Sequence, residues 1–247
     1  AVNASSDTYV AWNWLAGGSA VSNTDGTITS SVSANTKAGF SIVTYTGNGS
    51  SSQTVGHGLG ALSDPSFLIV KNRDQTDAWT VRININGTNS YLFLNSTAAS
   101  GSSSVGLPTT NVLNVGTSGF DNASGEDYVA YLFSSVDGYS KVGSYTGNGN
   151  ADGVFVYTGF RPAFVLIKIT SGTTSSWYIY DSARNTFNPA NFFLRPDLAD
   201  AELTGTPIDI VSNGFKIRSS SSGVNYSAAN YIYLAFAEQP AKYSNAR

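Results

Sequence analysis

Short apolar runs alternate with clusters of glycine, asparagine and serine along the whole chain. Runs of this length between turn-forming residues are typical of the strands of a β-sandwich or β-barrel. At residues 40–45 and 215–218 apolar and polar positions alternate, which predicts strands with one buried face. Residues 67–70, 164–167 and 231–236 are apolar at nearly every position, which predicts central strands covered on both faces. Two packed layers of strands explain both kinds of run.

The apolar pattern has no helical period over a useful length. The best candidate for a helix is a single turn over residues 197–202, directly after Pro196. Turn residues are frequent, because Thr-Gly-Asn-Gly at 46–49 and at 146–149 supplies positions that tolerate positive φ. The sequence therefore predicts an all-β protein.

The same pattern occurs twice, with an offset of about 100 residues. The order of the matching pieces is the same in both copies. They are residues 44–49 with 144–149, 65–71 with 162–168, Trp79 with Trp177, 91–94 with 191–194, and 128–133 with 231–236. Colinear self-similarity of this kind indicates one structural unit used in tandem.

The repeat predicts two tandem antiparallel β-sandwich units of jelly-roll or lectin-like type, at residues 17–138 and 139–240, followed by a C-terminal tail at 241–247. Residues 1–16 contain a segment, 7–14, that is similar to the last strand of a unit at 127–133. We therefore expect residues 1–16 to be the truncated final strand of an upstream repeat. Because the chain begins with Ala1 instead of methionine, we expect the C-terminal portion of a longer polypeptide, or a processed product.

Charge and composition narrow the classes of partner. Only 12% of the residues are charged, about half the usual share, and the net charge is −3. This balance argues against a nucleic-acid binder, which needs a basic surface to contact phosphates. With no cysteine the chain has no disulfide, no cysteine-bound zinc and no thiol nucleophile. No apolar run approaches the roughly 20 residues of a membrane span, so we expect a soluble protein without membrane insertion.

Catalytic signals are weak. The single histidine, His57, lies in a glycine-rich bend at residues 55–60, and no motif supplies the acid or nucleophile that a general base needs. The matching place in the second unit has no histidine. We expect His57 to make a structural hydrogen bond, and we expect neither enzymatic activity nor a cofactor.

One loop is rich in carboxylates, Asp121, Glu126 and Asp127. Oxygen ligands of this kind suit Ca²⁺, but their spacing fits no EF-hand, and the matching loop at 224–230 has only neutral oxygens. A solvated turn is the preferred interpretation, and a metal site is the alternative.

The aromatic residues invite a sugar-binding hypothesis, because aromatic faces stack on sugar rings. Trp79 and Trp177 occupy the same place in the repeat, however, and a repeated position favours a core residue. Trp12 and Trp14 are expected to pack as well.

Asp181, Arg184 and Asn185 are the candidate ligand-binding residues. They follow a predicted strand, and the first unit has no obvious counterpart. An ion pair that stabilises the loop is the alternative interpretation, and it is the one we prefer.

Several segments resemble the repeated C-terminal region of structural proteins from marine tailed phages, notably phages of cyanobacteria. These segments are residues 9–14, 21–30, 38–49, 55–60, 69–74, 159–168 and 235–240. The resemblance implies a tail-fibre or other virion structural protein and brings no catalytic residues with it. The serine- and glycine-rich loop at 95–110 differs most from its counterpart at 195–204, so the units should differ in function there.

From the resemblance we expect a non-enzymatic protein of the virion surface, outside the cell, that serves as a tail-fibre or spike module. Its partners would be a host-surface glycan or protein and other virion proteins, and by analogy with fibres it would self-associate, as a trimer. Three alternatives remain open: a purely structural capsid decoration or fibre spacer, a tail protein that acts on polysaccharide, and a bacterial lectin or adhesin.

Overall fold

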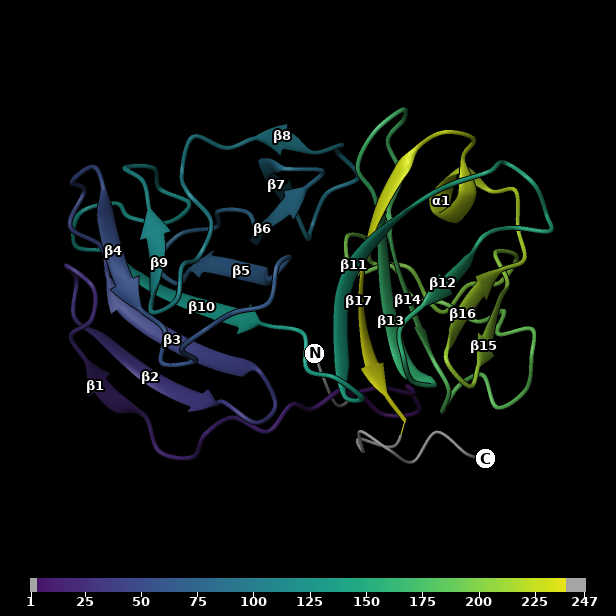
Figure 1. Ribbon diagram of the computed structural model, residues 1–247, viewed down its shortest axis with the longest axis horizontal. Coiled ribbons are helices and arrows are strands. Elements are labelled where there is room, and N and C mark those ends of the chain that lie inside the picture. The colour runs from purple at the N-terminus through teal and green to yellow at the C-terminus, as the bar shows by residue number, and fades with distance from the viewer. Residues whose placement is uncertain (1–3, 239–247) are drawn as a thin grey trace.

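The computed structural model describes residues 4–238, and the expected tail at 241–247 lies outside this part of the chain. The described residues are almost entirely β structure with several antiparallel sheets (Figure 1). Their one helix, α1 (Ser222–Asn225), has four residues, and no helix in residues 4–238 has the length and apolar character of a membrane span.

The first half forms two sheets. The large sheet has eight strands in the order β1-β2-β3-β10-β5-β6-β7-β8. Its strands are β1 (Val21–Asn23), β2 (Ser30–Asn35), β3 (Phe40–Thr46), β5 (Phe67–Asn72), β6 (Thr80–Ile85), β7 (Thr88–Phe93), β8 (Gly101–Ser102) and β10 (Asp127–Phe133). The small sheet pairs β4 (Gln53–Gly56) with β9 (Val112–Val115).

The second half also forms a larger and a smaller sheet. The larger has the order β11-β17-β13-β14, with β11 (Ser140–Thr146), β13 (Pro162–Ile169), β14 (Trp177–Asp181) and β17 (Asn230–Ala237). The smaller has the order β12-β16-β15, with β12 (Phe155–Tyr157), β15 (Ile208–Val211) and β16 (Gly214–Ile217). In both halves the central strand is the last one of that half, β10 or β17.

Three apolar cores lie between these sheets. One core joins the large first-half sheet to β4 and β9, and another joins the second-half sheets to each other. The third and central core takes residues from the large sheets of both halves, among them Phe67 and Leu92 from the first and Leu166 and Trp177 from the second. The two halves therefore share a core and lie side by side (Figure 1).

Alternation along β5 and β13 shows why their sequences are apolar throughout. Phe67 faces the central core and Leu68 faces the core beneath the small sheet. In the same way Leu166 faces the central core and Ile167 the outer core of the second half. The prediction that these strands are covered on both faces is confirmed, and the second cover is the other half of the chain.

Matching loop contacts recur in the two halves. Tyr45 Oη donates to Asp121 O at 2.6 Å, and Tyr145 Oη donates to Val224 O at 2.7 Å. Asn122 Nδ2 and Asn225 Nδ2 each bind three oxygens, one of them the side chain of the Asn in the Thr-Gly-Asn-Gly turn. These turns need glycine, because a Cβ on Gly47 would lie 2.3 Å from Ala123 O.

Two local expectations are wrong. No strand forms at residues 7–14, and directly after this segment Asn35 Nδ2 of β2 donates to Leu15 O at 3.0 Å. Trp12 and Trp14 still pack against the central core, as expected. No helical turn forms at 197–202, where Arg195 and Asp200 pair instead, and the helix lies at α1.

The loop at residues 95–101 fastens the first half to the second. Ser100 N and Oγ both donate to Thr170 O, and Trp177 Nε1 donates to Phe93 O at 2.9 Å. Lys168 is fully buried, and its Nζ donates to Thr97 O at 2.9 Å and to Ser175 O. The loop that differs most between the repeats is thus held rigidly at its start.

Lys168 should make stability depend on pH. Burial lowers the pKa of its ammonium from 10.5 to about 8, and the nearby Asp197 carboxylate opposes this only partly. Between these values the unfolded chain holds a proton that the folded chain has lost, so stability rises with pH through this window. We expect the wild type to gain about 1 kcal/mol of unfolding free energy over Lys168→Met between pH 8 and pH 9.5, because solvent screening reduces the full effect. Urea unfolding of both proteins at each pH tests this, and parallel pH profiles would contradict it.

Candidate functional site

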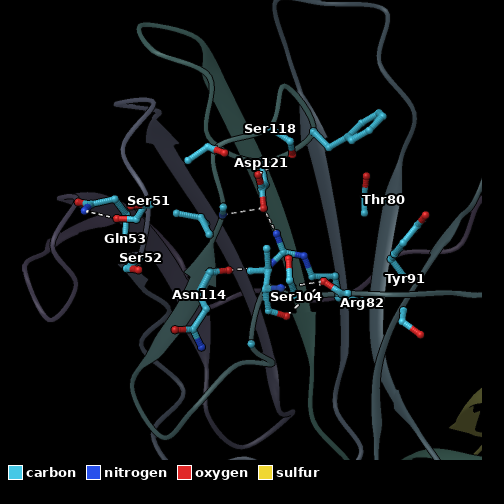
Figure 2. Close-up of a pocket in the computed structure, with 18 of the residues that line it drawn as sticks. Ser51, Ser52, Gln53, Thr80, Arg82, Tyr91, Ser104, Asn114, Ser118 and Asp121 are labelled. Carbon is cyan, nitrogen blue, oxygen red and sulfur yellow. Dashed lines mark hydrogen bonds and ion pairs between the residues drawn. The ribbon is translucent and has the colours of Figure 1, made fainter.

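An open pocket of about 660 Å³ lies in the first half (Figure 2). It is lined by residues 51–53, 102–106 and 114–118 and by Thr80, Arg82, Tyr91, Phe93, Phe120 and Asp121. Figure 2 shows Thr80 and Tyr91 on one side, the residues from 51–53 on the other, and Arg82 with Asp121 between them. Its volume lies within the range of about 300–1,000 Å³ that is usual for small-ligand sites.

The second half is filled at the corresponding place. Thr80 and Arg82 of β6 pair with Val70 and Leu68 of β5. In the second half, Tyr178 and Tyr180 of β14 pair with the matching residues of β13, Ile167 and Val165. Thr80 therefore corresponds to Tyr178, and Arg82 corresponds to Tyr180. Asp121 corresponds to Val224, since each carbonyl accepts the matching tyrosine hydroxyl. Tyr178, Tyr180 and Val224 belong to an apolar core. Smaller and charged side chains at the same positions leave the first half hollow.

A buried ion pair forms the floor of the pocket. Arg82 is 4% exposed and Asp121 is 2% exposed, and Arg82 Nη2 binds Asp121 Oδ2. Arg82 Nη1 also donates to Asn114 O at 2.5 Å. Asp121 accepts from Gly116 N at 3.0 Å and from Ser118 Oγ at 2.9 Å. Both carboxylate oxygens are occupied, so the pair holds β6, β9 and the 116–121 loop together.

Tyr45 lies next to this ion pair, since its hydroxyl donates to the backbone oxygen of Asp121. Burial raises the pKa of its phenol strongly, the Asp121 charge raises it further, and the Arg82 charge lowers it. Tyr45 therefore stays protonated and keeps donating to Asp121 O at any pH the protein experiences.

Thr80 contributes a hydroxyl without a partner. Its side chain is 5% exposed and lines the pocket, and its Oγ1 has no hydrogen bond within the described residues. A buried hydroxyl without a partner costs about 1–3 kcal/mol. This atom is therefore a polar group available to a molecule in the pocket.

Three aromatic rings form one wall. Tyr91 and Phe93 have ring centroids 5.5 Å apart, and Phe93 and Phe120 are also 5.5 Å apart. Phe120 is 39% exposed, so part of its ring is open to the pocket and to solvent. The strip gives a polar pocket an apolar surface on one side.

The serine- and glycine-rich loop contributes part of the rim, through residues 102–106. This loop was expected to carry the functional difference between the halves, and the structure places it at the pocket. Thr80 and Arg82 were not predicted as site residues. The sequence could have indicated them, because Thr80 and Arg82 stand where the second half has the large aromatic residues Tyr178 and Tyr180.

Asp181, Arg184 and Asn185 lie together but are occupied internally. Arg184 pairs with Asp181 and with Glu202, each at 2.6 Å, and its guanidinium lies 5.9 Å from the centre of the Trp12 ring. The Asn185 amide bonds both the N–H and the C=O of Phe192. The ion-pair alternative agrees with this geometry, and ligand binding at these residues stays a prediction.

Asp121, Glu126 and Asp127 have separate partners. Glu126 accepts from Asn72 Nδ2 at 2.5 Å, and Asp127 accepts from Thr46 Oγ1 at 2.8 Å. Within residues 4–238 no group of three or more histidine or carboxylate side chains is placed to hold a metal ion. The expected solvated turn is wrong for Asp121, because the Arg82 charge draws it inside.

His57 is buried and makes the expected structural hydrogen bonds. Its Nδ1 accepts from Leu59 N at 3.2 Å, so Nε2 donates to Thr109 O at 3.1 Å. Burial lowers the pKa of the imidazole, which keeps the ring neutral.

The two repeated tryptophans differ. Trp177 is fully buried, as predicted, whereas Trp79 is 37% exposed, so the prediction of a core residue is wrong there. Trp177 belongs to the shared central core and Trp79 does not, although β6, which begins directly after Trp79, contributes Val81 and Ile83 to that core.

Comparison with known proteins gives one match. No curated protein and no solved structure is significantly similar to this chain. Residues 1–240 match a family described as a domain of unknown function, DUF7483. This match covers nearly the whole sequence, and the chain therefore belongs to the DUF7483 family.

Proposed function

We propose that this protein is a non-enzymatic attachment module of a phage virion surface, part of a tail fibre or spike, which binds a host-surface glycan in the pocket of its first half. The observation that carries the proposal is the hollow itself. Two halves with the same loop contacts differ at three corresponding positions, and these positions line a polar pocket in the first half, whereas their counterparts belong to an apolar core in the second.

Duplication of a sandwich unit is part of the proposal. The paired loop bonds of Tyr45 and Tyr145 support it, as do the matching amides of Asn122 and Asn225. After duplication, one copy keeps its apolar filling and the other is free to change without loss of the shared central core.

The pocket has the properties of a preformed binding site. The loop that forms its rim is fastened to the second half by Ser100, and its floor is held by the Arg82–Asp121 pair. A rigid site loses little entropy when it binds, which favours recognition by a few polar contacts. Hydroxyl, amide and aromatic groups in one pocket suit a sugar.

The pocket supports binding better than glycoside cleavage. Hydrolysis commonly uses two carboxyl groups across the scissile bond. Asp121 is the one carboxylate among the residues that line this pocket, and its oxygens bind Arg82, Gly116 and Ser118. A buried, fully bonded carboxylate has no free oxygen to attack a sugar or protonate its leaving group.

Location on a virion rests on the resemblance to phage structural proteins. In a fibre several copies act together, so that weak single-site affinity is multiplied by avidity. This pocket, repeated in each copy of a homo-oligomer, agrees with this mode of attachment.

The proposal predicts binding that a filled pocket abolishes. The full chain, displayed in many copies on fluorescent beads, should bind host bacteria or their extracted surface glycans. Ser104→Trp places a bulky side chain at the pocket rim and should abolish this binding, because Ser104 is an exposed lining residue. Ser220→Trp makes the same change at an exposed serine outside the pocket and should bind as the wild type does.

Two outcomes would contradict the proposal. If neither display binds any host cell or glycan, the attachment role fails and a purely structural role is favoured. If the wild type releases sugar from host polysaccharide, the protein is an enzyme.

A further inference from the structure

The charges in the pocket cancel. Among the lining residues Arg82 and Asp121 are the charged ones, and they bind each other. The remaining hydrogen bonds of the pair go to Asn114 O, Gly116 N and Ser118 Oγ. No lining charge is therefore left to neutralise a charge on a ligand.

We infer that the pocket binds a neutral sugar ring, with the Thr80 hydroxyl bonding one sugar hydroxyl and the Tyr91–Phe93–Phe120 strip covering the apolar face of the ring. This inference rests on the proposed function and names its ligand class. Lining hydroxyls and amides such as Ser104 and Gln53 supply the neutral hydrogen-bonding surface that such a ligand needs.

Thr80 gives the inference its polar anchor. Its Oγ1 is buried and without a partner in the described residues, so a ligand hydroxyl that reaches it gains a hydrogen bond at little cost in lost solvation. A hydroxyl can donate and accept at once, as every sugar hydroxyl can. The two groups are therefore matched whichever one donates.

The aromatic strip gives the second contact. A pyranose ring is polar around its rim and carries C–H groups on its faces. Phe120 is 39% exposed and follows Phe93 at 5.5 Å, so its ring is available to such a face. Thr80 lies beside this strip, because it pairs with Phe93 across β6 and β7. A polar anchor next to an apolar surface matches the hydroxyl rim and the C–H face of one sugar ring.

A charged sugar is disfavoured by the same geometry. A uronate entering the pocket loses water around its carboxylate, and the Arg82 guanidinium is already bound to Asp121. An uncompensated buried charge is far more costly than a buried hydroxyl that finds a partner. The buried ion pair therefore makes the pocket favour a neutral sugar over a uronate.

Matched sugar pairs test the ligand class. Oligosaccharides of glucose, galactose and mannose, and the corresponding uronic acids, are titrated into the full chain by calorimetry and by saturation-transfer NMR. A neutral member should bind, and its uronate counterpart should bind about tenfold more weakly or worse. The affinity for the neutral sugar should not change between low and high salt, because no net charge is paired.

Three variants test the anchor. Thr80→Val keeps the shape and removes the hydroxyl, and it should weaken binding about tenfold, equivalent to about 1.4 kcal/mol. Thr80→Ser keeps the hydroxyl and should retain most of the affinity. Thr110→Val makes the Thr80→Val change at an exposed threonine outside the pocket and should have no effect. Circular dichroism melting curves confirm that each variant is folded.

The outcomes separate the two proposals. Tighter binding of a uronate overturns the neutral class, and unchanged affinity in Thr80→Val overturns the anchor. In either case attachment survives if Ser104→Trp still abolishes cell binding. Attachment itself fails if the display binds no host surface, and the ligand class then fails with it.

Discussion

Replacing Asp121 by alanine is expected to lower the free energy of unfolding by about 3–5 kcal/mol. The change leaves the Arg82 guanidinium buried at 4% exposure without its counter-charge. It also removes the acceptor of the Gly116 N–H and of the Ser118 hydroxyl. Urea unfolding followed by tryptophan fluorescence measures the loss.

Two further variants test whether the burial of the unpaired Arg82 charge causes the loss of stability in Asp121→Ala. Glu238→Ala breaks the exposed pair with Arg161 and should cost less than about 1 kcal/mol. Replacing both pocket charges with apolar residues, as Arg82→Met with Asp121→Val, should recover most of the loss, because no charge is then left unpaired. A double variant as unstable as Asp121→Ala would show that the ion pair itself, and not an orphaned charge, supplies the stability.

Replacing Trp177 by alanine is expected to cost about 3–5 kcal/mol. Its indole is fully buried in the central core, packs edge-on against Phe67 of the other half, and donates to Phe93 O. The cavity would therefore open between the two halves. Differential scanning calorimetry should show a lower melting temperature and a loss of cooperativity between the halves.

Trp79→Ala is the matched control, since Trp79 occupies the same place in the other repeat. Its side chain is 37% exposed and lies outside the central core, so the cost should stay under about 1 kcal/mol. Equal losses in the two variants would contradict the shared core described above, because they would place both tryptophans in comparable environments.

The strands of this fold were predictable from the sequence, and so were several of its turns. Alternation at residues 40–45 predicted β3 with its buried face, and apolar residues at 67–70 and 164–167 predicted strands covered on both sides. Thr-Gly-Asn-Gly at 46–49 and at 146–149 predicted turns with positive φ, and Gly49 and Gly149 have φ of 70° and 68°. These features depend on neighbouring residues, whose side chains point to opposite faces in a fixed order.

The candidate site was predictable only in part. The difference between the loops at 95–110 and 195–204 drew attention to a segment that lines the pocket. Arg184 looked like a surface residue because two of its partners, Glu202 and Trp12, are distant in the chain. Asp121 looked like part of a solvated loop for the same reason, since Arg82 lies 39 positions away.

The sequence by itself determined that this is a β protein and where several of its strands lie, and it predicted that one pattern is used twice. Only the tertiary structure decided that the two large sheets cover each other, which buries Trp177 and leaves Trp79 partly exposed. It also decided that Arg82 and Asp121 meet beneath an open pocket, where Tyr180 and Val224 fill the other half. The physical reason is that local patterning sets which face of a strand is apolar, whereas packing between distant segments decides what covers that face and where space remains.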